Sequence, residues 1–477
     1  MAVEIKIKKN PSIFEKKPLA EIYSEIKEVY LGDNRPWVIG FSGGKDSTAT
    51  LQLVWNAIKQ IPIEKRKKTI FVISSDTLVE TPMISGSIEK TLEKINAAAK
   101  EQTLPIQANK VTPVITDSFW VNMIGKGYPA PSTKFRWCTE RLKIRPADQF
   151  ILDKVSKFGE VVVVLGARKS ESASRAQVMG LYKIKDSKLS KHSRFPQTWV
   201  YTPVEDFGVN DVWDYLLKNK NPWGNENRDL LALYQSASAG ECPLVIDNST
   251  PSCGNSRFGC WVCTVVQKDK SMQSLVDHGE DWLEPLLEIR NFLALTQDPD
   301  KKHIYRDYKR RSGRVDFKSD GSGRISRGPY TLQFCKELLR KLLAAENTIK
   351  KSRPNMDFTI IKSEELYEIR RIWLTERGDW DDSVPKICGE LISRELEWAT
   401  DDFGTFQVLD KEILETVCEQ NPNEGKMISR LMDIERVYRT MARRSSIYQK
   451  IGSTLREEWR SEKEVLAEAK SKRPETR

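Results

Sequence analysis

Residues 41–47 have the sequence Phe41-Ser42-Gly43-Gly44-Lys45-Asp46-Ser47 and join two apolar segments. Residues 36–41 form a nearly continuous apolar run that predicts a buried strand, and residues 46–60 have the apolar periodicity of a helix. Two glycines allow a ligand to approach the backbone closely, and unpaired N–H groups at a helix N-terminus attract anions. Ser42 and Ser47 add hydroxyls and Lys45 adds a cation. The stretch therefore predicts a phosphate-binding loop, with an ordinary strand–turn–helix corner as the alternative.

Strands and helices alternate through the first half of the chain. Apolar runs at residues 69–74 and 160–166 predict further buried strands, a weaker strand is predicted near 110–115, and a helix is predicted over 82–100. Strands that are apolar on both faces predict an α/β fold, in which helices cover both faces of a parallel sheet. Ligands of such sheets bind at the carboxyl ends of the strands, where the glycine loop lies.

The composition predicts a soluble cytoplasmic protein of more than one domain. The chain has 477 residues, which suggests about two or three domains. No segment approaches the ~20 uninterrupted apolar residues of a membrane span, and the N-terminus is charged where a signal peptide is apolar. We therefore expect no membrane association. Eight cysteines in a cytoplasmic chain do not predict a disulfide framework.

Four of the cysteines lie in one short segment. Cys242, Cys253, Cys260 and Cys263 have the spacing C-x10-C-x6-C-x2-C. A C-x-x-C pair with two further cysteines upstream suits either a [4Fe–4S] cluster or a tetrahedral Zn²⁺ site. Prolines and glycines between the cysteines favour a chain folded around a metal over four unrelated buried thiols.

Cys138 lies apart from this segment, in a basic and aromatic context. Lys134, Arg136 and Trp137 precede it, and a helix is predicted to follow it. Nearby cations and a helix N-terminus lower the pKa of a thiol and favour the thiolate. We therefore predict that Cys138 carries sulfur as a persulfide or attacks as a thiolate. A ligand of the metal cluster and an inert buried cysteine are the alternatives.

Residues 301–328 are strongly basic, with ten Lys and Arg against three Asp, in a chain of formal net charge +10. Tyr305, Tyr308 and Phe317 are interleaved with these cations. Cations contact phosphates without reading sequence, and aromatic faces stack on bases. The segment therefore predicts nucleic-acid binding, with a solvated run of charge as the alternative.

These features divide the chain into five parts. Residues 1–35 are an N-terminal lead-in, residues 36–240 the α/β domain, residues 241–300 the cysteine-rich cluster segment, and residues 301–328 the basic nucleic-acid-binding segment. Residues 329–477 combine helical periodicity with heavy charge and predict a mostly helical C-terminal region.

Five motifs follow one another along residues 36–240. They are Ser42–Ser47; Asp76-Thr77 with Glu80-Thr81-Pro82; Arg136-Trp137-Cys138-Thr139 with Lys143; Gly166-Ala167-Arg168-Lys169-Ser170-Glu171-Ser172 leading to Arg175; and Pro203 to Trp213-Asp214-Tyr215-Leu216. In this order they resemble the phosphoadenylylsulfate (PAPS) reductase-like branch of the pyrophosphate-loop (PP-loop) enzymes, which share an adenine nucleotide α-hydrolase-like fold and cleave ATP between the α and β phosphates. With the cysteine-rich segment, the basic segment and the helical region, the whole chain resembles the DndC family, the ATP-dependent sulfurtransferases of bacterial DNA phosphorothioation.

The resemblance implies an ATP site at the glycine loop. The phosphates would lie on Ser42, Gly43, Gly44, Lys45, Asp46 and Ser47. Lys45 and Asp46 would be catalytic, and Asp46 is also a candidate ligand of Mg²⁺. Asp76 and Gly166 would frame the adenosine, with a turn residue as the alternative for Asp76. Arg168, Lys169 and Arg175 form a cationic arc suited to a phosphate, with a solvated loop that contains structural ion pairs as the alternative. The four clustered cysteines would hold [4Fe–4S] in preference to Zn²⁺.

The function implied by the resemblance is sulfur transfer to DNA. ATP cleavage would adenylylate a non-bridging oxygen of a backbone phosphate, and sulfur would then replace that oxygen. A cysteine desulfurase would donate the sulfur, and other phosphorothioation proteins, including a DNA-handling ATPase, would be partners. The alternatives are an assimilatory PAPS or APS reductase, a tRNA thiolase of the same loop class and a non-catalytic DNA-binding subunit. Trp137 weakens the reductase alternative, because related reductases with clusters have a Cys-Cys pair in this region.

Overall fold

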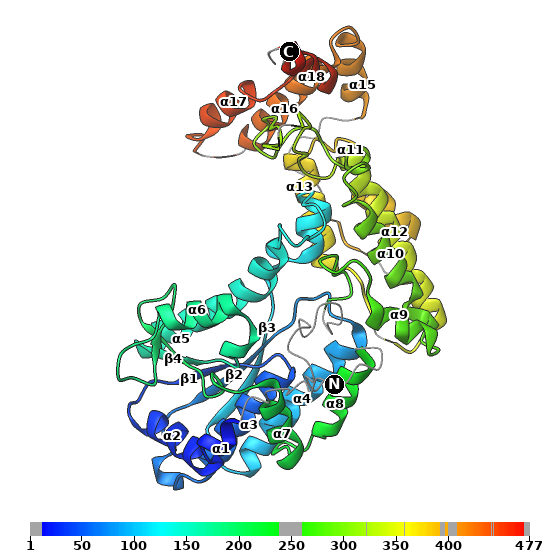
Figure 1. Cartoon of the computed structure of the whole chain (residues 1–477). Coiled ribbons are helices and arrows are strands. Elements are labelled where there is room, and N and C mark those ends of the chain that lie inside the picture. The colour runs from blue at the N-terminus through cyan, green and yellow to red at the C-terminus, as the bar shows by residue number, and fades with distance from the viewer. Residues whose placement is uncertain are drawn as a thin grey trace, which may run out of the picture. The chain divides into compact units, whose positions relative to one another are not determined.

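The computed structural model describes residues 12–237, 260–320, 322–356, 358–391, 396–398, 408–439, 441 and 443–471. The chain divides into two compact units (Figure 1). We name them the sheet unit, which comprises Met1–Pro113, Cys138–Cys260 and Asp269–Ser274, and the helical unit, which comprises Val114–Trp137, Trp261–Lys268 and Leu275–Arg477. Each unit is described by itself below.

A six-stranded sheet forms the centre of the sheet unit (Figure 1). Its strand order is β3-β2-β1-β4-β6-β5, and all neighbouring strands are parallel except β5 and β6. The strands are β1 (Trp37–Gly40), β2 (Ile70–Ser75), β3 (Ile106–Val111), β4 (Val161–Val164), β5 (Ser190–Lys191) and β6 (Thr198–Tyr201). The predicted α/β fold is confirmed, with one short antiparallel strand added at an edge.

Helices cover both faces of this sheet, which explains the unbroken apolar runs of its central strands. In β1, Trp37 and Ile39 lie in one buried cluster and Val38 lies in another, because successive side chains of a strand point to opposite faces. The first cluster includes side chains of α2 (Leu19–Leu31), α3 (Lys45–Lys59), α4 (Pro82–Glu101) and α7 (Val209–Lys218). The second includes side chains of α5 (Arg145–Phe158).

Three strands differ from the sequence prediction. The strand expected near residues 110–115 is β3, which ends at Val111, and most of its side chains are at least partly exposed at the edge of the sheet. Its sequence is therefore half polar, and the apolar residues that suggested a strand lie mostly beyond its end. The strands β5 and β6 were not predicted: β5 has only two residues, and the two middle residues of β6 are only partly buried, so neither forms a continuous buried apolar run.

The sheet unit contains further helices. They are α1 (Ile13–Lys16), η1 (Ile63–Lys65), η4 (Thr139–Ile144), η5 (Lys169–Glu171), α6 (Ala173–Leu181) and α8 (Asn227–Ala237). The helix α9 (Lys270–Asp277) begins in the sheet unit and ends in the helical unit.

Helices dominate the helical unit, as the sequence predicted for the C-terminal region. They are η2 (Ile115–Asp117), η3 (Val121–Gly125), η6 (Asp281–Leu283), α10 (Glu284–Leu295), α11 (Lys302–Tyr305), α12 (Leu332–Ser352), α13 (Ser363–Glu376), α14 (Ser383–Leu391), α15 (Val408–Val417), α16 (Pro422–Arg439), α17 (Ile447–Leu455) and α18 (Glu462–Ser471). Leu338 and Leu342 of α12 and Ile369 of α13 are completely buried, and they form part of the apolar interior of this unit.

Residues 114–137 belong to the helical unit, although the sequence division placed them within the α/β domain. Two indoles anchor this segment: the Nε1 of Trp120 donates a hydrogen bond to the carbonyl of Ile360, and the Nε1 of Trp373 donates one to the carbonyl of Ile124, each at 2.9 Å. Both indoles are completely buried. An unpaired buried N–H is costly, so these two bonds tie the segment firmly to α13 and the residues before it.

Candidate active site

The glycine loop lies between β1 and α3, as predicted, and hydrogen bonds of its two serines stabilise its conformation. Gly43 has a φ of +72°, a conformation that favours glycine, and Gly44 caps the N-terminus of α3. The hydroxyl of Ser47 accepts a hydrogen bond from the backbone N–H of Ser42 at 3.2 Å and lies 2.9 Å from the carbonyl of Gly44. The two serine hydroxyls are 3.1 Å apart. The serines therefore shape the loop before any phosphate binds.

A tyrosine that the sequence did not predict contacts the same loop. The hydroxyl of Tyr234, on α8, accepts a hydrogen bond from the backbone N–H of Lys45 at 3.3 Å. The Nζ of Lys45 lies 5.1 Å from the centre of the Tyr234 ring. N–H groups in the first turn of a helix are the donors that bind anions. The phenol oxygen therefore lies where a phosphate oxygen of a bound nucleotide would compete for the same donor.

Asp46 is engaged by two cations. The Nε of Arg168 lies 2.6 Å from one carboxylate oxygen and the Nζ of Lys45 lies 3.1 Å from the other. The side chain of Arg168 is only 3% exposed, and its Nη1 donates a second hydrogen bond to the hydroxyl of Ser170 at 2.9 Å. Arg168 therefore holds Asp46 in place through an ion pair.

Gly166 packs against the first turn of α3. A Cβ at this position would lie 2.8 Å from the carbonyl oxygen of Asp46 and 3.0 Å from the backbone nitrogen of Ser47. Gly166 follows β4, and β4 pairs with β1 at the point where the strand order reverses. This is the crevice in which doubly wound sheets bind ligands. The absence of a side chain at Gly166 lets the two loops at the crevice approach each other.

Asp76 and Arg175 have local partners in the structure. A carboxylate oxygen of Asp76 accepts a hydrogen bond from the backbone N–H of Leu78 at 2.8 Å, and Leu78 has a φ of +64°. The Nζ of Lys110 lies 3.8 Å from the other oxygen. Arg175 pairs with Glu171, one helical turn before it, on an exposed surface. Asp76 thus shapes the turn after β2, and Arg175 lies in an ion pair of modest strength.

The thiol of Cys260 lies against two residues of the second motif. It is 3.2 Å from the hydroxyl of Thr77 and 3.7 Å from a carboxylate oxygen of Glu80. The Nζ of Lys143 lies 3.9 Å from the same oxygen of Glu80. Burial raises the pKa of Cys260 to about 12, the Glu80 carboxylate adds to this, and Cys138 is close enough to contribute as well. The structure therefore brings Cys138 and Cys260 into one neighbourhood.

Only two of the four cysteines predicted to hold a metal lie among the described residues. Cys242 and Cys253 lie outside the described residues, while Cys260 and Cys263 lie within them and are both partly exposed. Among the described residues, no three His, Cys, Asp or Glu side chains converge as metal ligands. The C-x-x-C pair is chemically suited to iron or zinc, so the described residues supply half of the predicted donor set.

Comparison with known proteins identifies the domain around this site. Residues 36–266 match the family model of the phosphoadenosine phosphosulfate reductase domain. Residues 36–266 are therefore similar to a PAPS reductase domain. It is also 25% identical over 284 residues to the uncharacterized protein MJ0066 of Methanocaldococcus jannaschii, a match that covers 59% of this chain and 48% of that protein. The chain therefore spans about half the length of this curated relative.

Two solved structures are similar to parts of the chain. The PAPS reductase of Candida auris is 16% identical, with a TM-score of 0.28 over 46% of this chain and 88% of that one. The U34-tRNA thiolase NcsA of Methanococcus maripaludis, solved with its [4Fe–4S] cluster, is 12% identical, with a TM-score of 0.26 over 64% of this chain and 90% of that one.

The PAPS reductase-like domain thus gathers the glycine loop, Arg168 and Gly166 at one crevice. Tyr234 was missed because nothing in the residues of α8 indicates that this helix returns to the loop. In the described part of the chain, no helix has the length and apolarity needed to cross a membrane.

Proposed function

We propose that the protein is an ATP-dependent sulfurtransferase that replaces a non-bridging oxygen of the DNA backbone with sulfur, as its resemblance to the DndC family implies. The observation that carries the proposal is the glycine loop of the PAPS reductase-like domain. There the N-terminus of α3 and the nearly buried Lys45 offer N–H donors and a cation to a phosphate group. Such a preorganised site stabilises the negative charge that develops on departing pyrophosphate.

In the first step, an oxygen of the acceptor phosphate attacks the α phosphorus of ATP. The bond from the α phosphorus to the oxygen that bridges to the β phosphorus breaks, and pyrophosphate leaves. The backbone N–H of Lys45 exchanges the Tyr234 hydroxyl for a phosphate oxygen, and the Lys45 ammonium approaches the leaving group. Asp46 is already shared by Arg168 and Lys45. We therefore assign Asp46 to the positioning of Lys45 in preference to Mg²⁺ ligation.

In the second step, the terminal sulfur of a persulfide on Cys138 attacks the adenylylated phosphorus, and AMP leaves. A thiol reductant then attacks the Cys138 sulfur, the S–S bond breaks, and the phosphorothioate is released as a disulfide forms. A cysteine desulfurase supplies the persulfide sulfur, and the other phosphorothioation proteins deliver the DNA. Cys242, Cys253, Cys260 and Cys263 would hold a [4Fe–4S] cluster or Zn²⁺; a bound cluster would offer a second sulfur-carrying centre.

The test combines nucleotide analysis with analysis of the DNA. The protein, ATP, a desulfurase with cysteine and a thiol reductant are incubated with duplex DNA in one reaction and with single-stranded DNA in a parallel one. AMP and pyrophosphate are measured, and phosphorothioate dinucleotides are detected by mass spectrometry after nuclease digestion. We expect both products, and we expect Lys45→Ala to lower AMP formation by about 100-fold or more. Lys59→Ala, an exposed lysine at the other end of α3, is the matched control and should leave the rate unchanged.

Three results would overturn the proposal in favour of its alternatives. Thioredoxin-dependent release of sulfite from PAPS, without cleavage of ATP, would indicate a reductase. Sulfur found in tRNA but not in DNA would indicate a tRNA thiolase. DNA binding without any formation of AMP would indicate a non-catalytic subunit.

A further inference from the structure

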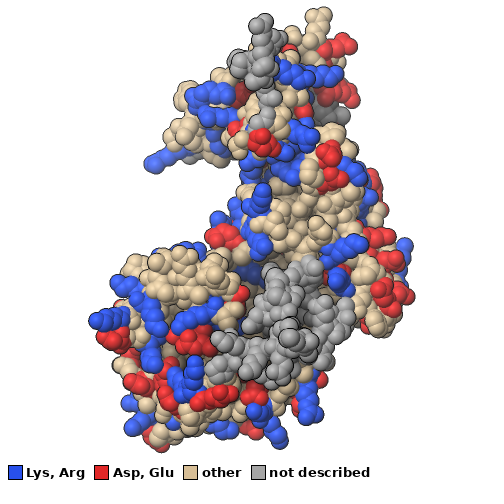
Figure 2. Space-filling view, in the orientation of Figure 1, with Lys and Arg blue, Asp and Glu red and all other residues tan. Residues whose placement is uncertain are grey.

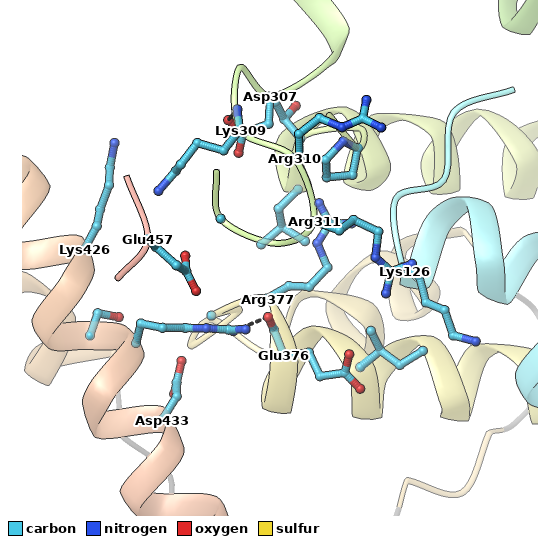
Figure 3. Close-up of a pocket in the computed structure, with 18 of the residues that line it drawn as sticks. Lys126, Asp307, Lys309, Arg310, Arg311, Glu376, Arg377, Lys426, Asp433 and Glu457 are labelled. Carbon is cyan, nitrogen blue, oxygen red and sulfur yellow. Dashed lines mark hydrogen bonds between the residues drawn. The ribbon is translucent and has the colours of Figure 1, made fainter. Parts of the chain in front are cut away.

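A cavity of about 520 Å³ lies within the helical unit (Figure 3). Part of the basic segment forms one wall, the C-terminal end of α13 and the middle of α16 form others, and Trp459 closes the side near α18. We name it the basic cavity. Among its described lining residues, seven are Lys or Arg and four are Asp or Glu: Lys126, Lys309, Arg310, Arg311, Arg377, Lys426 and Arg430 against Asp307, Glu376, Asp433 and Glu457.

Two of these cations are held by neutral groups. The Arg377 guanidinium donates to the carbonyls of Tyr330 at 2.6 Å and Gly125 at 3.3 Å, and it lies 3.3 Å from the Cys335 sulfur. Arg430 donates to the backbone carbonyl of Glu376. These contacts fix the position of each guanidinium, and a neutral acceptor does not cancel its charge. Fixed cations of this kind are preorganised for an anion.

Two further cations face the cavity without an ion pair among the described residues. The Arg311 guanidinium lies 4.6 Å from the centre of the Tyr128 ring, which supports it through a cation–π contact. The Lys309 amino group lies 4.2 Å from the centre of the Trp459 ring. Burial lowers the pKa of Lys309, and the charge of Lys426 lowers it further, while Asp307 and Glu457 oppose this. Figure 3 shows Lys309 and Lys426 extending toward the same side of the cavity.

Three of the four carboxylates around the cavity have polar partners, and the charges of Asp307 and Glu457 still act on Lys309. Asp433 accepts a hydrogen bond from the Trp380 indole at 2.9 Å and lies 3.6 Å from Arg436. Glu376 lies 3.7 Å from Arg371, and Asp307 accepts from the backbone N–H of Lys309 at 3.0 Å. With seven cations against four carboxylates in its described lining, the cavity retains a positive field. On the face of the molecule in Figure 2, Lys and Arg side chains are exposed among Asp and Glu.

Trp459 gives the cavity a fixed aromatic surface. Its Nε1 donates to the carbonyl of Thr454 at 2.9 Å, which sets the orientation of the ring. Aromatic side chains beside cations are the elements of single-strand binding, in which phosphates contact the cations and bases stack on the rings. A volume of about 520 Å³ is in the range of pockets that hold one small ligand. It suits one or two nucleotides of a strand, whereas a duplex is too wide to enter.

We propose that the basic cavity binds a single-stranded DNA segment, with a phosphodiester on Arg311, Arg377 and Lys426 and a base against Trp459. The inference rests on the proposed function for the identity of the nucleic acid, and it names the surface that holds the acceptor strand. The 301–328 segment contributes only one wall of this site. Lys126, Arg377, Lys426 and Trp459 come from other parts of the chain, so the structure extends the interface well beyond the basic segment.

Binding is tested with the full-length protein and a fluorescein-labelled single strand of about 16 nucleotides, the upper site size of a single-strand binding fold. Fluorescence anisotropy is recorded across a range of salt concentrations. We expect Arg311→Ala and Lys426→Ala each to weaken binding about ten-fold. Each should also reduce the slope of log K against log salt by about 0.7 for every phosphate that the variant no longer neutralises. Trp459→Leu should weaken binding about ten-fold with an unchanged slope.

Arg314→Ala and Lys318→Ala are matched controls, because both residues are exposed, basic and in the same segment but do not line the cavity. If these controls weaken binding equally, the proposal is wrong, because binding then depends on overall charge and not on the cavity. Stronger binding of a phosphopeptide, or full competition by inorganic phosphate, would overturn it in favour of a different anion. Thermal melting confirms that each variant is folded.

The two proposals fail in distinguishable ways. Lys45→Ala should abolish AMP formation and keep binding the strand, while the cavity variants should bind it weakly. If cavity variants bind and thiolate DNA normally, the cavity assignment is wrong and the sulfurtransferase proposal stands. If the cavity binds DNA as expected but no phosphorothioate forms, the sulfurtransferase proposal is wrong and the binding site stands.

Discussion

Gly166→Ala tests whether this glycine is needed for close packing against α3 or for contact with the nucleobase. The size of its effect follows from distances in the structure. A Cβ at residue 166 would lie 2.8 Å from the carbonyl oxygen of Asp46 and 2.9 Å from its carbonyl carbon. Both are backbone atoms, so no flexible side chain can move aside. Because ordinary contact begins at 3.4 Å, the first turn of α3 or the loop after β4 must shift by about 0.6 Å.

The shift has a cost in both stability and activity. Overpacking of this kind destabilises a fold by about 1–3 kcal/mol. At about 2–4 °C for each kcal/mol in a unit of this size, the melting temperature of the sheet unit should fall by about 2–12 °C. A displacement approaching 1 Å at a catalytic loop costs about 100-fold in rate. We therefore expect AMP formation to fall by about 10–100-fold in the same variant.

Gly180→Ala is the matched control, because Gly180 lies within α6 and no atom lies within 4 Å of an added Cβ. There the substitution removes a helix-weakening glycine and should stabilise by about 0.5–1 kcal/mol. Melting temperature and ATP affinity are measured for both variants. If Gly166→Ala weakens ATP binding without changing the melting temperature, the packing argument is refuted. Gly166 would then serve the nucleobase, as the sequence analysis predicted.

Four further predictions concern the site and the sheet unit. Arg168→Met removes one partner of a largely buried ion pair and should destabilise the protein by about 3 kcal/mol in urea unfolding; an unchanged midpoint would show that Lys45 compensates. Tyr234→Phe removes a hydroxyl that competes for the Lys45 N–H and should lower the KM for ATP about 2–10-fold, whereas a raised KM would make the phenol a ligand of the nucleotide. Burial raises the pKa of Tyr30 to about 12, so its stabilising contribution is present below pH 10 and is lost as the pH rises to 12; Tyr30→Phe should flatten the dependence of unfolding free energy on pH in that window. If the four clustered cysteines hold a [4Fe–4S] cluster, Cys263→Ser should lose iron during anaerobic purification while Cys138→Ser keeps it; loss from both would make Cys138 a ligand, and zinc in place of iron would contradict the cluster assignment.

The central fold could be predicted from the sequence because its strands are buried on both faces. Residues such as Trp37, Val38 and Ile39 need no knowledge of their partners to be recognised, since every position of the strand is apolar and covered. The glycine loop is equally local, because strand, turn and helix are continuous in sequence. The edge strand β5 and its neighbour β6 could not be predicted, since their pairing is imposed by neighbours and not by their own composition.

The parts of the site that the sequence missed depend on contacts between distant residues. Tyr234 reaches Lys45 across 189 positions of sequence. Trp373 reaches Ile124 across 249 positions, and this contact places residues 114–137 in the helical unit. No periodicity or motif records such a pairing. The sequence identified Arg168 as a cation in a motif. Only the structure shows that it is buried and paired with Asp46.

In the sheet unit, the glycine loop and the Cys260 thiol lie at turns that follow neighbouring parallel strands. Adjacent parallel strands β2, β1 and β4 end in the Asp76–Glu80 turn, the glycine loop and Gly166, respectively. The thiol of Cys260 lies on the first of these turns, through Thr77 and Glu80, and Cys138 lies close to Cys260. Parallel strands are about 4.8 Å apart, so neighbouring turns at their carboxyl ends are only a few ångströms from one another. Under the proposed function, a sulfur carried on Cys138 would start near the turn that follows β2, next to the strand that leads into the glycine loop.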